Sequence, residues 1–178
     1  MTPGRAAILK VLDTYRALGY GLSRIEVQKL AYFLQEAGEP LNLSFEKNAY
    51  GPYSDTLRHV LNTMEGHFIR GLGDGVVEAE IEPIPDAMTE AETFIGTHGH
   101  EAMAEHVRRV GDLIDGFQSP YGMELLATVH WVAKNEGAAS PEQALAAVRS
   151  WNDRKKSLMA PMHVEAAWNR LHQSGWLN

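Results

Sequence analysis

The sequence SRIEVQKLAYFLQEAG at residues 23–38 decides the fold of the chain's first half. Ser23 and Glu26 match a capping box, in which each side chain accepts a hydrogen bond from the other residue's backbone amide and so starts a helix. Val27, Leu30 and Leu34 follow at spacings of three and four, which place them on one helical face. The stretch therefore predicts an amphipathic helix with a buried apolar face.

The segments around this helix predict that the first half of the chain contains both helices and strands. Thr2 and Pro3 have the cap-plus-proline pattern of another helix start. Residues 41–45 alternate between apolar and polar side chains, which predicts a short strand, and Pro52 and Ser54 start a helix over 54–65. Residues 67–82 predict a hairpin with a second arm over 76–82. This order of elements resembles a winged-helix layout.

The second half is predicted to be helical after Pro83 and Pro85. Predicted helices cover residues 86–95, 101–117, 120–135, 141–151 and 162–173. The fold class is therefore mainly α with a small antiparallel β hairpin, as a winged-helix-like half (1–82) and a helical half (83–178). We expect one domain over residues 1–178. The basic run Arg154-Lys155-Lys156 is predicted to be a solvated surface loop.

The composition restricts the classes of function. The 178 residues contain no cysteine, which excludes disulfides, zinc–thiolate sites and thiol nucleophiles. No signal peptide and no apolar run of transmembrane length are visible, so a cytoplasmic protein without membrane contact is expected. The net charge is −7, which disfavours nucleic acid as a partner.

The negative charge is concentrated in one stretch of the sequence. No lysine or arginine occurs between Gly71 and Val107, where nine acidic residues are found. Glu78, Glu80 and Glu82 alternate with apolar residues and should line one face of a hairpin arm. Exposed carboxylates can simply keep a protein soluble. Alternatively, a row of them can imitate a nucleic-acid backbone and dock into a basic groove.

Several other candidate sites have alternatives. The glycine-rich run 71–75 predicts a turn, because a phosphate loop would need a helix after it. His98, His100 and His106 could build a metal-dependent hydrolase, but a spacing of six between the last two does not place them on one helical face. A DNA-reading helix would use Arg58, His59 and Asn62.

Aromatic side chains flank the predicted loops at Tyr50, Tyr53, His67 and Phe68. Aromatic residues on loops can anchor an interface, although Phe68 is expected to lie in the core. No nucleophile elbow and no perturbed acid–base pair are predicted, so the residues indicate no reaction, no cofactor and no metal.

Two segments carry a resemblance to a known family. Residues 50–75 (YGPYSDTLRHVLNTMEGHFIRGLGDG) and 28–38 (QKLAYFLQEAG) resemble the C-terminal domain of DarG antitoxins, and more generally Panacea-type antitoxin domains. In that family DarT is a toxin that ADP-ribosylates DNA. The macrodomain of DarG removes the modification, and its C-terminal domain binds and blocks the toxin. The resemblance covers most of residues 22–178 and includes no macrodomain.

The resemblance implies a non-enzymatic antitoxin domain whose partner is a DarT-like ADP-ribosyltransferase, bound by acidic DNA mimicry and without direct contact to nucleic acid. A winged-helix DNA-binding regulator is the alternative. The expected toxin contacts are Tyr53, His59, His67, Arg70, Asp74, Glu78, Glu80 and Glu82.

Overall fold

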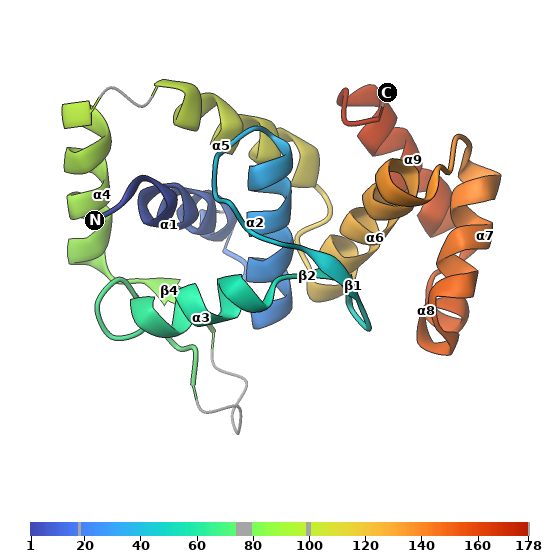
Figure 1. Ribbon diagram of the computed structural model, residues 1–178, viewed down its shortest axis with the longest axis horizontal. Coiled ribbons are helices and arrows are strands. Elements are labelled where there is room, and N and C mark those ends of the chain that lie inside the picture. The colour runs from blue at the N-terminus through green and yellow to red at the C-terminus, as the bar shows by residue number, and fades with distance from the viewer. Residues whose placement is uncertain (18, 74–79, 99–100, 178) are drawn as a thin grey trace.

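The computed structural model describes residues 1–17, 19–73, 80–98 and 101–177 (Figure 1). The elements, in chain order, are α1 (Pro3–Arg16), α2 (Arg24–Glu36), β1 (Glu46–Asn48), β2 (Gly51–Tyr53), α3 (Asp55–Met64), β3 (Ile69–Arg70), β4 (Glu82–Pro83), α4 (Pro85–His98), α5 (Glu101–Ile114), α6 (Pro120–Glu136), α7 (Pro141–Trp151), α8 (Asp153–Leu158) and α9 (Pro161–Gln173). The mainly α fold with small antiparallel sheets is confirmed.

Helix α2 lies at the centre of the described structure (Figure 1). It packs against α1 and α5 on one side and against α6 on the other, and α6 in turn packs against α7 and α9. The predicted apolar face accounts for this position, because Val27, Leu30 and Leu34 are fully buried. The capping box is also present, since Ser23 accepts a hydrogen bond from the Glu26 amide and Glu26 accepts one from the Ser23 amide. The predicted start of this helix is therefore confirmed.

The strand predicted over residues 41–45 is wrong. Those residues form no strand, because the Gln35 side chain satisfies the backbone of Leu43, donating to its carbonyl at 2.9 Å and accepting from its amide at 2.7 Å. The strand pair lies next to them, where β1 and β2 form an antiparallel hairpin that pairs Glu46 with Tyr53. Pro52 is a strand residue here and not part of a helix start.

A second small hairpin pairs β3 with β4, with Arg70 opposite Glu82. The predicted second arm over 76–82 reaches the described structure only from Glu80 onward, because residues 74–79 lie outside the described residues. Ile81 is buried and Glu80 is exposed, as the alternation predicts. Pro83 belongs to the strand although it was predicted to end it.

The described part of the C-terminal half contains one helix more than predicted. The run 154–156 lies in α8, which Asn152 caps by accepting a hydrogen bond from the Lys155 amide at 2.8 Å. The predicted loop is therefore wrong. Arg154 and Lys156 are exposed as expected, but the Lys155 side chain is fully buried. None of the helices within the described ranges is both long and apolar enough to cross a membrane.

Candidate functional site

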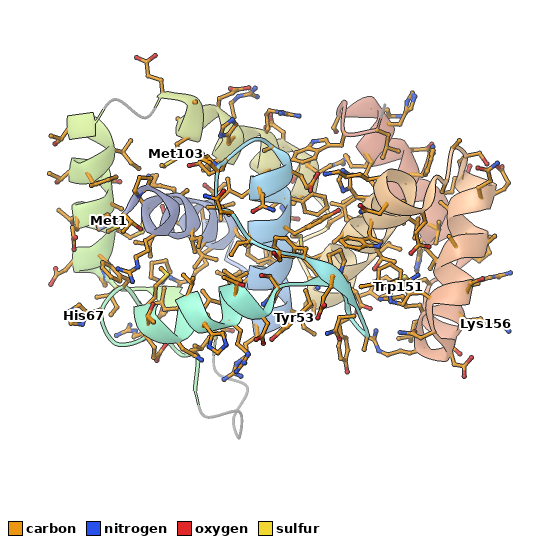
Figure 2. The ribbon with its side chains drawn as sticks, in the orientation of Figure 1. Met1, Tyr53, His67, Met103, Trp151 and Lys156 are labelled. Atoms are coloured by element: carbon orange, nitrogen blue, oxygen red, sulfur yellow. The ribbon has the colours of Figure 1, made fainter. Side chains whose placement is uncertain are left out.

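A pocket of about 350 Å³ opens where α2, the β1–β2 hairpin and α3 meet. Figure 2 places Tyr53 at this junction, beside the start of α3. The lining combines two tyrosine rings, three cationic side chains and three side-chain amides with an apolar wall. The polar and aromatic members are Arg24, Gln28, Lys29, Asn48, Tyr50, Tyr53, Arg58 and Asn62.

Helix α2 and the start of α3 are tied together at the edge of this pocket. The Gln28 side chain donates to the Ser54 carbonyl and accepts from the Ser54 amide, both at 2.9 Å. The Ser54 hydroxyl caps α3 by accepting from the Leu57 amide at 3.2 Å. Because both groups of Gln28 and the cap are buried, breaking this link would leave unpaired polar atoms in the interior. The pocket wall is therefore held by specific bonds as well as by packing.

Lys29 contributes a buried amine to the pocket. Its side chain is 1 % exposed, and its Nζ donates a hydrogen bond to the Pro52 carbonyl at 2.6 Å. Burial lowers the pKa of Lys29 to about 7; the charge of Glu124 acts to raise it and that of Lys155 to lower it further. The pocket thus contains an amine that changes its charge near neutral pH.

The Gly51 backbone makes the close contact between the hairpin and this amine possible. Gly51 has φ +95°, and a Cβ there would lie 3.1 Å from Thr128 Oγ1 and 3.4 Å from Lys29 Cε. Glycine is the residue that adopts this conformation without strain and leaves this space. Thr128 Oγ1 is buried and, within the described part of the chain, has no hydrogen-bond partner.

A buried ion cluster supports the hairpin from behind. Glu124 of α6 accepts hydrogen bonds from Arg154, at 2.6 and 3.1 Å, and from the Lys155 amine. The Arg154 guanidinium lies 4.3 Å from the centre of the Tyr50 ring, which lines the pocket. The Trp151 indole donates to the Asn48 carbonyl at 2.9 Å. The end of α7 and the start of α8 therefore fix the turn between β1 and β2.

The lining favours a ligand with negative charge and a flat ring. Arg24 and Arg58 supply guanidinium groups, and the pocket has no carboxylate among its described lining residues. Guanidinium groups match phosphate geometry, tyrosine rings stack on bases, and asparagine amides can read base edges. Arg24 already donates to the carbonyls of Leu72 and Gly73, and Arg58 pairs with Asp55 at 2.8 Å. Chemically, the arrangement suits a nucleotide.

The structure does not bring the predicted contact residues into one site. Tyr53 lines the pocket, whereas exposed His67 lies near the other end of α3 (Figure 2). His59 lies on the exposed side of α3, 3.3 Å from Asp55. Arg70 and Glu82 pair with each other, and Glu80 is exposed. Asp74 and Glu78 lie outside the described residues.

Much of the acidic stretch is neutralised within the chain. Glu82 binds Arg16 at 2.9 Å as well as Arg70, and the hydrogen bond from Arg70 holds the pKa of Glu82 below its usual value. Glu92 lies 3.5 Å from the amine of Lys10 on α1. Glu105 pairs with Arg108 at 2.6 Å. Among the described residues of the stretch, the carboxylates of Glu82, Glu92 and Glu105 are therefore paired with cations of the same chain and are not free.

The predicted histidine alternative gains no geometric support. His106 Nδ1 lies 2.8 Å from a carboxylate oxygen of Glu39, which is buried. His100 and the side chain of His98 lie outside the described residues. Across the described ranges no group of three potential metal ligands comes together.

The sequence prediction missed most of the pocket. Tyr50 and Tyr53 were considered as anchors, and Arg58 and Asn62 as DNA contacts, but Arg24, Gln28, Lys29 and Asn48 were not considered. One signal was available: Gln28 and Lys29 are adjacent polar residues in a helix whose apolar face was predicted to be buried, and the structure buries both of them. A buried lysine and glutamine need partners, so they mark a place where polar chemistry enters the core.

Comparison with known proteins gives relatives over nearly the whole chain. A DNA ADP-ribosyl glycohydrolase of Thermus aquaticus is 43% identical over 177 residues, which cover 99% of this chain and 48% of that protein. The proteins of the same name from Mycobacterium tuberculosis and Mycobacterium bovis are 40% identical over 185 residues, covering 96% of this chain and 53% of theirs. No protein-family model matches the chain. The chain thus spans about half the length of these relatives.

The relatives' name contradicts the predicted function. It denotes an enzyme that acts on ADP-ribosylated DNA, whereas the sequence patterns and the DarG resemblance led to a non-enzymatic antitoxin domain. The predictions of a DarT-like toxin as partner and of no contact with nucleic acid are contradicted by the same name. The winged-helix regulator has no support from these relatives either. The chain is similar in sequence to one half of proteins named DNA ADP-ribosyl glycohydrolase.

Proposed function

We propose that this chain takes part in removing ADP-ribose from DNA, and that its pocket binds a nucleotide unit of the ADP-ribosylated substrate. The similarity to DNA ADP-ribosyl glycohydrolases along nearly the entire chain supports this class of function. This role is assigned to the part of those glycohydrolases that the chain matches, which is about half of their length. A cytoplasmic location remains a prediction.

The observation that carries the proposal is the composition of the pocket. Tyr50 and Tyr53 offer ring faces beside the cationic groups of Arg24, Lys29 and Arg58. Stacking of a base on an aromatic side chain contributes about 1–3 kcal/mol, and it does not depend strongly on the base. The volume of about 350 Å³ is at the small end of ligand sites, which suits one nucleotide better than a longer segment.

The lining supports substrate binding more directly than bond cleavage. Glycoside hydrolysis typically uses two carboxyl groups, one as acid and one as base or nucleophile. The pocket's described lining residues include neither aspartate nor glutamate. We therefore assign the pocket the role of holding the substrate and not that of cleaving the bond.

The test measures binding of a fluorescent single-stranded oligonucleotide that carries one ADP-ribosyl group, alongside the same oligonucleotide without it. We expect tighter binding of the modified strand. Tyr53→Leu should weaken that binding roughly tenfold, because it removes a stacking surface. Arg58→Gln should weaken it as well. Arg149→Gln, an exposed arginine on α7, is the matched control and should bind like the unaltered chain.

Two results would overturn the proposal. One is the absence of binding to either oligonucleotide at high micromolar protein. The other is release of ADP-ribose by the chain at a rate that Tyr53→Leu and Arg58→Gln leave unchanged, because the pocket would then have no part in the reaction.

A further inference from the structure

Lys29 has unused capacity to bind an anion. Its ammonium group has three donors, and the hydrogen bond to Pro52 uses one of them. Among the residues that the structure describes, no carboxylate lies within ion-pair distance of this amine. A buried ammonium without a charged partner is costly, so a negatively charged ligand would stabilise it.

The groups around Lys29 explain why the protein itself does not supply this partner. Glu124 on α6 is the acidic group whose charge acts on Lys29, but its oxygens already bind Arg154 and Lys155 of α8. The other elements around the pocket contribute neutral or positive groups. The charged and titratable groups that line the pocket with the amine are Arg24 of α2, Tyr50 and Tyr53 of the hairpin and Arg58 of α3. The groups whose charges act on it are Glu124 of α6 and Lys155 of α8.

We propose that the pocket binds the phosphate group of its ligand next to the Lys29 amine, and that the amine takes up a proton when the ligand binds. This inference rests on the proposed nucleotide pocket and adds the ligand's anionic group and its dependence on pH. The free protein holds this amine partly deprotonated near neutral pH, because burial disfavours its charged form. A phosphate nearby favours the charged form. Binding and protonation are then linked, so each strengthens the other.

Isothermal titration calorimetry tests the linkage directly. ADP-ribose is the probe, because its two phosphates carry no group that titrates near neutral pH. Titrations at pH 7 in two buffers with different heats of ionisation give the number of protons exchanged. We expect uptake of roughly half a proton, and an affinity that falls about tenfold between pH 6 and pH 8. Adenosine, which lacks phosphate, should bind without proton uptake.

Lys29→Met should abolish both the proton uptake and the dependence on pH. Lys156→Met, on the exposed side of α8, is the matched control and should behave like the unaltered chain (Figure 2). Because Lys29 is buried, the variant's fold is checked by thermal unfolding. The measurement on the unaltered chain does not depend on the variant.

The outcomes separate this inference from the function on which it rests. ADP-ribose that binds with equal affinity from pH 6 to pH 8 and without proton exchange would overturn the inference, and the nucleotide pocket would stand. Failure of both ADP-ribose and the modified oligonucleotide to bind at any pH would overturn both.

Discussion

Gly51 shows how one residue determines the shape of the pocket. Its φ of +95° lies in the left-handed region, and its missing side chain lets the hairpin approach Lys29 and Thr128. The hydrogen bond from Lys29 to Pro52 depends on that approach. A larger residue at this position would therefore disturb both the backbone and the buried amine.

We expect Gly51→Ala to lower the free energy of unfolding by about 2–4 kcal/mol. A left-handed backbone costs a residue with a Cβ roughly 1–2 kcal/mol, and the new methyl group would also crowd Thr128 Oγ1 at 3.1 Å. Urea denaturation followed by circular dichroism measures the change.

Gly66→Ala is the matched control for this variant. Gly66 has φ +79°, and nothing lies within 4 Å of a Cβ placed there. Gly66→Ala should lose only the free energy that the left-handed backbone costs a residue with a Cβ. The difference in free energy of unfolding between the two variants then gives the cost of crowding at Gly51. Equal losses would show that the Gly51 contact with Thr128 and Lys29 does not constrain the fold.

At the scale of elements, the sequence predicts helices better than strands, for a physical reason. Helix starts are local: Ser23, Ser54 and Ser140 each cap a helix as their neighbours in the sequence predict. The β1–β2 hairpin instead depends on distant partners, because Trp151 and Asn152 bond to its turn from about a hundred residues away. No local pattern contains that information.

The pocket could not be predicted from the sequence for the same reason, because its residues depend on partners that are distant in the sequence. Lys155 looked like part of an exposed basic run, but its partner Glu124 lies 31 residues earlier, on another helix. Lys29 and Glu124 are linked only through the packing of α2 on α6. Side chains that meet across elements could not be matched from spacing alone.

The Glu124 cluster predicts a strong link between α6 and α8. Glu124→Gln should lower the free energy of unfolding by about 3–5 kcal/mol, because it leaves the buried Lys155 amine without an opposite charge. Glu105→Gln is the control, since Glu105 pairs with Arg108 on an exposed surface, where solvent screens an ion pair and its removal should change stability little. Urea unfolding of the two variants measures both effects. Similar small losses would mean that Arg154 and Lys155 do not need this carboxylate.

At the scale of the whole molecule, His130 couples the core to pH. It lies on α6, is 3 % exposed, and its Nδ1 is 2.7 Å from the Tyr32 hydroxyl of α2. The Trp176 ring lies 6.1 Å from its ring, so the C-terminal segment closes over it. Burial lowers the pKa of His130 from 6.5 to about 4, with opposing contributions from Glu36 and from a backbone hydrogen bond to Trp176.

This buried histidine should make the protein less stable as the pH falls below neutrality. The unfolded chain binds the proton near pH 6.5 and the folded chain only near pH 4, so the proton favours unfolding between these values. Each pH unit in that window costs about 1.4 kcal/mol, or about 2 kcal/mol between pH 6.5 and 5. Above pH 6.5 the full contribution to stability is present. Urea midpoints at several pH values measure this slope, and His130→Gln should flatten it because glutamine does not titrate. If the urea midpoints of the two proteins changed with pH in parallel, another titratable group would cause the pH dependence of stability. The protonation of His130 would then not govern how the C-terminal segment holds the core together.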